Sequence, residues 1–574
     1  MTEERSLLSS SASRGSVLQR GKACIRCRRR KMKCDGVRPI CTPCIDANRA
    51  DDCEYTDNHS ITRTQLLEEN VARLESRLQE LEGSPGSSQT LTLRDPYVVP
   101  RLSTGCRTGS QTSPSQMPSI PATQEGRWED PDPPSQMSEM LISIFLPNSR
   151  ALGFALDVDR FRERTSLPTS HIERPHPALL DAVYVWALRL SSRMELRQRE
   201  DACLQRAILA LQGSTLNHGE HAAHHRVEAV QAEVLIALYF LCLGHNFEAR
   251  YHANAAVALA FSCSLHQVKE ANENLTALSL PPPSDDNERA ERIRVFWSVF
   301  ELDSCWSAEL ESPRSFTDNP TRGTQIDTPW TDVPVTETLG KTVQRFLLSE
   351  YLMLGDDGPH LASRSKASAI YGKTWDLAAR SDSVTRIEEE VRTLAHITAE
   401  FARRLPSLDE LDAFGDDVRL NMAVTHAIIH ASMIHLHHAL TPSATPTASD
   451  GLLTHADEIV SILEFSSRIC FPGNNATQSK FPDPFLAVCG WIAGRVLIEE
   501  IDRSMHGPRT HEIRSKRWKS LQNLGRLLSE LHNCAGFANT LPIFSRYAIM
   551  IEDELPRDAL REVQEIIVEN RKPA

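Results

Sequence analysis

Near its N-terminus the chain reads Cys24-Ile-Arg-Cys27-Arg-Arg-Arg-Lys-Met-Lys-Cys34-Asp-Gly-Val-Arg-Pro-Ile-Cys41-Thr-Pro-Cys44-Ile-Asp-Ala-Asn-Arg-Ala-Asp-Asp-Cys53. A Cys-x2-Cys pair occurs twice in this stretch, and a third cysteine follows each pair. Such a pair lets two thiolates reach one ion across a tight turn, as in structural zinc sites. Two tetrahedral ions need eight ligand positions, so six sulfurs suffice only if two of them bind both ions. The spacing therefore predicts two zinc ions held by six cysteines.

A disulfide framework is the alternative interpretation of the same cysteines, and it suits a secreted chain. The N-terminal residues Met1-Thr-Glu-Glu-Arg-Ser show no apolar signal segment. The other eight cysteines, from Cys106 to Cys534, are scattered without a pairing pattern, as in a reducing compartment. We therefore expect zinc rather than disulfides.

The two halves of this stretch are opposite in charge. Eight basic residues and no acidic residue lie between Arg20 and Lys33, whereas residues 45–52 are slightly acidic. The whole chain has a net charge of −13, so the rest of the chain carries −21 once these +8 charges are set aside. A solvated face or a nuclear import signal would also give such a basic run. A basic helix made rigid by metal fits a reader of the DNA major groove better.

The stretch resembles the fungal binuclear zinc cluster (Zn(2)-Cys(6)) family of transcription regulators. The resemblance rests on Ala23-Cys24-x2-Cys27-Arg28-x2-Lys31-x-Lys33-Cys34-Asp35-Gly36, on Arg38-Pro39, on Cys41-x2-Cys44 and on Cys53. It implies that all six cysteines bind zinc and that Cys24 and Cys41 bridge the two ions. It also implies that Lys31 reads a CGG triplet in double-stranded DNA. The flanking basic residues would hold phosphates: Arg26, Arg28, Arg30 and Lys33. The last spacer, eight residues between Cys44 and Cys53, is longer than the common six.

A heptad pattern follows the cysteines. Its apolar positions are Leu67, Val71, Leu74, Leu78 and Leu81, spaced 4, 3, 4 and 3. In a parallel pair of such helices, Arg63 would face Glu68 of the other copy and Arg77 would face Glu82. A short amphipathic helix can also pack on its own protein. The matched charges favour a parallel homodimer, although fewer than three heptads are marginal alone.

The rest of the chain divides by composition. We expect a disordered N-terminus over residues 1–19, the zinc module over 20–56, the coiled coil over 63–83, a disordered linker over 84–135 and an all-helical body over 136–570. The expected fold is thus a small six-cysteine two-zinc module and a short coiled coil, followed by a large all-α regulatory domain. No apolar run reaches the ~18 residues of a membrane span.

Part of the body resembles the fungal-specific transcription factor domain. The resemblance rests on residues 230–239, Leu265-His266, residues 291–303, Pro313 and residues 326–330. Glycine is common in this family two residues before the proline and directly before the Leu-His pair. Here Glu311 and Ser264 occupy those positions. We expect Phe296, Trp297 and Phe300 to pack in the core.

Motifs for catalysis are weak, so we expect no enzyme. Gly340-Lys-Thr and Gly372-Lys-Thr lack the upstream glycine of a phosphate-binding loop. His426 and His430, with His437 on the same face, could hold a metal ion, but helix histidines with ordinary partners are more common. The histidines at 218, 221, 224 and 225 carry a weak alternative as a pH or metal sensor.

Together these features predict a nuclear, zinc-dependent, sequence-specific regulator of RNA polymerase II genes. The resemblance suggests control of a metabolic or secondary-metabolite gene cluster. The partners would be double-stranded DNA and a second copy of the chain, with no membrane; co-regulators are not specified by the sequence. The alternative is a metabolite-sensing receptor whose helical body binds a small molecule and gates the DNA-binding module. Whether the chain activates or represses is not encoded in any of these motifs.

Overall fold

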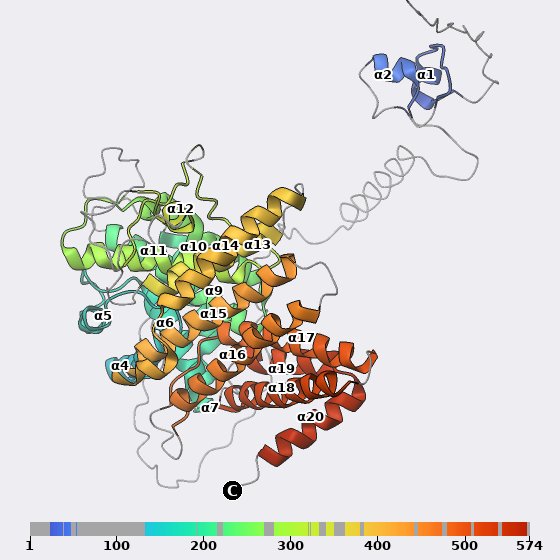
Figure 1. Cartoon of the computed structure of the whole chain (residues 1–574). Helices are drawn as coiled ribbons and strands as arrows, with labels where there is room; N and C mark the ends of the chain where they lie inside the picture. The colour runs from blue at the N-terminus through green and yellow to red at the C-terminus, as the bar shows by residue number, and fades with distance from the viewer. Residues whose placement is uncertain are drawn as a thin grey trace, which may run out of the picture. The chain divides into compact units, whose positions relative to one another are not determined.

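The computed structural model divides the chain into two compact units, Met1–Ser110 and Gln111–Ala574 (Figure 1). It describes residues 23–37, 40–47, 53, 133–191, 193–214, 222–268, 280–319, 321, 323–331, 340–348, 362–378, 384–440, 446–472, 479–506, 510–537 and 542–570.

The first unit contains two one-turn helices, α1 (Ile25–Arg29) and α2 (Thr42–Asp46). Its buried core within the described residues consists of the six cysteines, with Ala23 and Ile40 packed against them. So small an apolar core cannot hold a chain segment folded unaided.

The second unit is helical, and its described residues include no strand, which confirms the all-α body that the sequence predicts. Its helices are α4 (Ser135–Phe145), η2 (Leu146–Asn148), α5 (Val158–Thr165), α6 (Pro177–Leu190), α7 (Met194–Arg197), α8 (Glu200–Ser214), α9 (Ala222–Leu243), α10 (Asn246–Ser262), η3 (Leu265–Gln267), α11 (Asp286–Trp306), α12 (Thr342–Leu347), α13 (Ser363–Ala378), α14 (Val384–Arg404), η7 (Leu408–Ala413), α15 (Asp416–Leu440), α16 (Pro446–Cys470), α17 (Phe485–His506), α18 (His511–Phe537), α19 (Pro542–Glu554) and α20 (Arg557–Asn570).

Helices of the body pack mainly on neighbours in the chain. Contacts run from α4 to α6, from α9 through α10 to α11, and from α11 through α13 and α15 to α16, α17 and α18. Helix α19 returns to contact α9, so the last third of the body, coloured orange to red in Figure 1, closes onto the first third. The body therefore has one continuous apolar core rather than separate small ones.

Helix α11 contributes many buried residues to this core. Phe296, Trp297 and Phe300 are all buried, as the sequence predicts. The Trp297 ring stacks on Trp330 with centroids 4.2 Å apart, and its indole N–H donates to the carbonyl of Pro329 at 2.8 Å. These contacts hold the segment 324–330 against α11, because the segment supplies the acceptor that the buried Trp297 N–H needs.

A partly buried ion cluster ties α11 and α13 to the segment before α17. The Arg364 guanidinium lies 2.5 Å from a carboxylate oxygen of Asp483 and 3.1 Å from Glu301. Burial raises the pKa of the Glu301 carboxyl. The two carboxylates raise the pKa of Arg364 despite its desolvation. Removing the arginine alone would strand two shielded carboxylates, which is costly.

Among the helices that the structure describes, none combines the length and the apolar character that crossing a membrane requires.

Four non-glycine residues in the described part of the body adopt a backbone conformation that normally belongs to glycine, and two of them are Ser264 and Glu311. Ser264 has φ 56° and Glu311 has φ 48°. They are the two positions at which the resemblance leads one to expect glycine. Glu311 follows α11, where its N–H donates to the carbonyl of Ala308 and the N–H of Ser312 donates to Ser307. This hydrogen-bond pair is that of a Schellman motif, whose left-handed residue is usually glycine.

Replacing Glu311 by glycine should stabilise the body. A residue with a Cβ loses about 1–2 kcal/mol in the left-handed region, whereas glycine loses roughly 0.5–1 kcal/mol more backbone entropy on folding. The balance is a gain of about 0.5–1 kcal/mol in the free energy of unfolding. Urea unfolding of the full chain, followed by far-ultraviolet circular dichroism, measures it.

Glu311→Ala is the matched control, because it removes the same carboxylate and keeps the Cβ. If alanine stabilises the body as much as glycine does, the gain comes from the lost charge and the backbone argument is wrong.

Candidate metal centre and nucleic-acid interface

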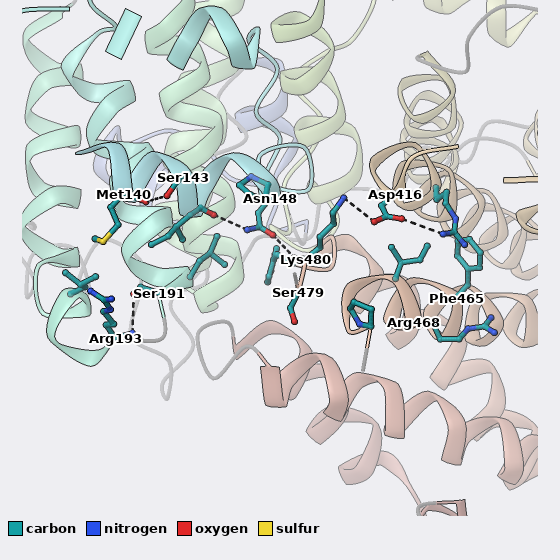
Figure 2. Close-up of a pocket in the computed structure, with 18 of the residues that line it drawn as sticks. Met140, Ser143, Asn148, Ser191, Arg193, Asp416, Phe465, Arg468, Ser479 and Lys480 are labelled. Carbon is teal, nitrogen blue, oxygen red and sulfur yellow. Dashed lines mark hydrogen bonds and ion pairs between the residues drawn. The ribbon is translucent and has the colours of Figure 1, made fainter. Parts of the chain in front are cut away.

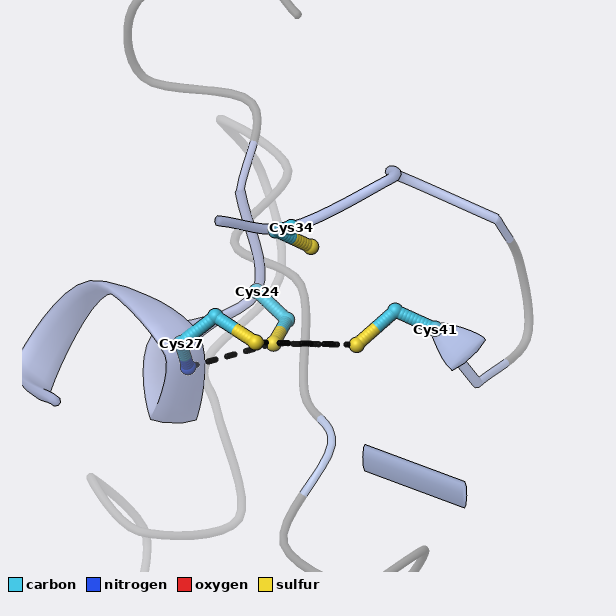
Figure 3. Close-up of side chains that lie close together, drawn as sticks. All are labelled: Cys24, Cys27, Cys34 and Cys41. Carbon is cyan, nitrogen blue, oxygen red and sulfur yellow. Dashed lines mark hydrogen bonds between the residues drawn. The ribbon is translucent and has the colours of Figure 1, made fainter. Parts of the chain in front are cut away.

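The structure gathers all six N-terminal cysteines in one cluster, four of which are drawn in Figure 3. Cys24 Sγ lies 3.7 Å from Cys41 Sγ and 3.8 Å from Cys44 Sγ. Cys27 Sγ and Cys53 Sγ lie 3.7 Å and 3.6 Å from Cys41 Sγ. All thirteen cysteines of the described residues are free thiols. The cluster is therefore not a disulfide framework.

The sulfurs form two four-membered groups. One group is Cys24, Cys27, Cys34 and Cys41, and the other is Cys24, Cys41, Cys44 and Cys53; the sulfurs of each lie within 4.8 Å of one another. A tetrahedral zinc with Zn–S bonds of about 2.3 Å needs sulfurs roughly 3.8 Å apart. Both groups fit zinc, and the two cysteines common to both groups are Cys24 and Cys41.

Each half of the cluster uses the same local structure. Cys24 is the N-cap of α1 and its Sγ accepts a hydrogen bond from the N–H of Cys27 at 3.4 Å. Cys41 is the N-cap of α2, and Cys44 occupies the third helical position, as Cys27 does in α1. The N–H of Cys41 donates to Cys53 Sγ at 3.3 Å. In each half, the N-cap cysteine and the cysteine at the third helical position thus have their sulfurs on the same side of the short helix.

The crowded, buried environment of the thiols favours binding of a cation. Burial, together with contact to Cys24, raises the pKa of Cys27 to about 12. Burial likewise raises the pKa of Cys41 and of Cys53. A metal ion would displace the protons of such crowded thiols into the solvent, since the thiolate is the form that binds zinc.

Arg26 lies beside the cluster. The Cys44 thiol is desolvated, yet hydrogen bonds from Cys41 and then from Arg26 lower its pKa. Arg26 is half-buried. One of the predicted phosphate-binding residues therefore also contacts a sulfur of the cluster.

Asp35 connects the two halves, a role that the sequence analysis does not assign. Its carboxylate accepts the N–H of Val37 at 3.3 Å and the N–H of Thr42, the first residue of α2, at 3.1 Å. Hydrogen bonds from Thr42, from its side chain above all, lower the pKa of the Asp35 carboxyl. The first contact is an Asx-turn, for which Asp followed by Gly36 is a sequence signal; the second depends on the fold.

Lys31 lies just beyond α1 in the left-handed region, with φ 51°. Its N–H donates to the carbonyl of Arg28 at 3.2 Å, and the N–H of Met32 donates to Cys27 at 2.9 Å. This is again the hydrogen-bond pair of a Schellman motif, with lysine in place of glycine. The predicted basic helix is therefore short: it ends at Arg29, and the sharp turn that follows points the chain away from the helix at Lys31.

The other predicted DNA contacts surround this turn. Arg28 and Arg30 are exposed, as are Lys31 and Lys33. The Arg28 guanidinium donates to the carbonyl of Ala23 at 3.1 Å. These four cations and Arg29, which is also exposed, thus lie within one short segment on the Cys24–Cys34 half of the module.

Two groups of predicted residues fall elsewhere. The predicted dimerisation residues Leu67, Val71, Leu74, Leu78 and Leu81 lie outside the described residues, as does Pro39. In the body, His426 Nε2 contacts the carbonyl of Pro406 at 2.9 Å, whereas His430 Nδ1 lies 3.0 Å from His455 Nδ1. These two histidines therefore have different partners and do not converge on one ion.

Comparison with known proteins identifies two domains. Residues 22–60 match the model of the fungal Zn(2)-Cys(6) binuclear cluster domain, and residues 142–329 match that of the fungal specific transcription factor domain.

Two curated relatives are citrinin biosynthesis transcriptional activators, from Monascus ruber and Monascus purpureus. Each is 26% identical over 325 residues, which is 51% of this chain and 60% and 54% of the respective relatives. A transcriptional activator of Neurospora crassa is 42% identical over 64 residues, covering 10% of this chain and 7% of that protein. The chain thus spans little more than half the length of the first two relatives.

Asp35→Ala should loosen the metal centre without removing a ligand. The N–H groups of Val37 and Thr42 would lose their acceptor, so the loop that connects the halves would open more often. Zinc transfer to a chelator should become several-fold faster when it is followed with a coloured zinc indicator.

Asp46→Ala, which removes an exposed aspartate at the end of α2, is the control and should leave the rate unchanged. Equal rates for the two variants would show that Asp35 does not hold the halves together.

Proposed function

Because the chain belongs to the fungal Zn(2)-Cys(6) binuclear cluster family of transcription regulators, we propose that it is a zinc-dependent, sequence-specific DNA-binding regulator of transcription. The observation that carries this proposal is the pair of sulfur groups that share Cys24 and Cys41 beside an exposed cationic turn. A transcription regulator acts on chromosomal DNA, so its place of action is the nucleus.

Two zinc ions per chain, bridged by Cys24 and Cys41, are the proposed cofactors. When bound, zinc would neutralise the charge of the thiolates and would fix their geometry. Apolar burial cannot order this short segment by itself. The cysteines of the module would then hold α1 and the turn at Lys31 in one orientation. A rigid cationic turn is what recognition of a DNA groove needs, since it is ordered before it binds.

The proposed DNA interface divides the cations by role. Lys31 would donate hydrogen bonds to guanine in the major groove of a CGG triplet. Arg26, Arg28, Arg30 and Lys33 would bind phosphates and supply salt-dependent affinity without sequence preference. The left-handed conformation of Lys31 supports this assignment, because strained backbone of this kind is concentrated at functional sites.

The proposed regulator binds as a homodimer through Leu67, Val71, Leu74, Leu78 and Leu81. The support is the heptad spacing and the cross-chain charges in the sequence. Two copies would read two triplets, and the segment between the module and the coil would set their spacing.

The names of the Monascus relatives suggest the target. Both are activators of the biosynthesis of a secondary metabolite. We therefore propose that this chain activates a gene cluster for a secondary metabolite, without assigning the metabolite.

Loss of a bridging sulfur should cost more metal than loss of a terminal one. Cys24→Ala removes a ligand of both groups and should release both ions, whereas Cys27→Ala removes a ligand of one group only. Zinc per chain, measured by elemental mass spectrometry on the purified protein, should fall to about none in the first case and to about one ion in the second.

If Cys24→Ala and Cys27→Ala retain the same amount of zinc, Cys24 is not a bridge. Cys203→Ala, which alters a buried thiol of the body, serves as the control for cysteine removal in general.

Lys31→Gly tests the reader of the bases. Glycine adopts the left-handed conformation freely, so the module should keep its fold and its zinc while losing only the lysine side chain. Discrimination between the preferred triplet and other sequences should fall by about 1–3 kcal/mol. Selection from random-sequence DNA, followed by binding titrations, measures this loss.

Arg28→Ala should instead weaken all sequences alike and reduce the salt dependence. A Lys31→Gly variant that keeps its zinc and still selects the same triplet would show that another residue reads the bases.

A further inference from the structure

A large cleft opens in the body between its first and last parts (Figure 2). Its volume is about 1340 Å³, and its walls come from α4, α7, η7, α15 and α16 together with the segment around Lys480. This exceeds the ~300–1,000 Å³ of typical small-molecule pockets, so a ligand would fill part of the space beside water.

Part of the cleft surface is apolar. Met140 and Ile144 of α4 line it on one side, Phe465 of α16 lines it on another, and Phe481 lies in the wall between. Side chains of this type offer a low-polarity surface to the carbon skeleton of a ligand.

The cations of the cleft are of two kinds. Arg419 and Lys480 are neutralised, since Arg419 lies 2.9 Å from Asp412 and Lys480 lies 2.7 Å from Asp417. Arg193, Arg197 and the exposed Arg468 differ, because no carboxylate of the described residues lies within ion-pair distance of their guanidinium groups. In a chain of net charge −13, two adjacent uncompensated arginines make an unusual anion-attracting site.

Ser191 organises this corner, and Figure 2 shows it beside Arg193 and Met140. Its hydroxyl accepts the N–H of Arg193 at 3.2 Å, and its carbonyl accepts the Arg197 Nε–H at 3.1 Å. The second contact fixes the Arg197 side chain and leaves its terminal N–H groups for another acceptor. Leu190 and Leu196 also line this end of the cleft.

We propose that the cleft binds a small amphipathic organic anion. Its carboxylate, phosphate or sulfonate would receive hydrogen bonds from Arg193 and Arg197, as guanidinium groups bind such oxygens in pairs. Its apolar skeleton would lie along Met140 and Ile144, which are both partly exposed. This site is independent of the DNA interface, and its existence does not rest on the proposed transcriptional role.

The position of the cleft gives such a ligand a physical effect on the body. The first and last parts of the chain meet beside it, where the Asn148 side-chain oxygen accepts the N–H of Phe481 at 2.7 Å. A ligand that contacts α4, α7 and the Lys480 segment together would stabilise this junction, because it binds only when the parts are in place.

Fluorescence titration of the full, zinc-loaded chain tests the site. The probe is anilinonaphthalene sulfonate, an aromatic anion whose emission rises in apolar surroundings. The neutral probe phenylnaphthylamine has the same ring system and lacks the sulfonate. The Arg193→Gln/Arg197→Gln variant should bind the anionic probe at least tenfold more weakly and the neutral probe with unchanged affinity.

The matched control is Arg392→Gln/Arg403→Gln, which removes two exposed arginines from α14 and should change neither affinity. If the double cleft variant fails to fold by circular dichroism, Arg193→Gln alone should weaken the anionic probe in the same direction. The proposal is overturned if the folded chain shows no saturable binding of the anionic probe. It is also overturned if the cleft variant binds that probe as the wild type does, or if it loses both probes equally.

Discussion

The sharing of two sulfurs between two groups of ligands is the constraint on which the N-terminal module depends. Its described core is six cysteines with two small apolar neighbours, too little to offset the entropy of ordering the chain. Metal binding must therefore supply the folding energy. Because Cys24 and Cys41 belong to both sulfur groups, a short segment could close two proposed sites, and each half would then depend on the other. The Asp35 carboxylate adds a second, weaker connection between them.

Residues in the left-handed backbone conformation recur where the chain changes direction. The physical explanation for the strain differs from one such residue to another. Lys31 and Glu311 each follow a helix in a Schellman motif, and each replaces the usual glycine. At Lys31 the strained turn presents an exposed ammonium beside four other cations, which is what the proposed DNA contact requires. At Glu311 the described structure offers no comparable purpose, so the strain there is a cost that folding of the large body absorbs.

The body combines a rigid helical core with a cleft that could bind a ligand. Stacking of Trp297 on Trp330 and the ions around Arg364 fix α11 and α13 in this core. The cleft, in contrast, lies where distant parts of the chain meet, and it contains cations whose charge the described residues do not neutralise. Buried apolar packing thus fixes the architecture, while uncompensated charge at a junction marks the candidate site.

The sequence alone was enough to predict the six-cysteine cluster and the helices of the body, because metal ligation and amphipathic packing each impose a local pattern. The end of α1 before Lys31 was not, since residues 28–33 contain neither glycine nor proline to mark a stop. The contact of Asp35 with Thr42 and the corner formed by Ser191, Arg193 and Arg197 opposite α16 required the tertiary structure. The first depends on the fold of the module, and the second is part of a site only because α4, α16 and the Lys480 segment line the same cleft. Neither leaves a period in a sequence.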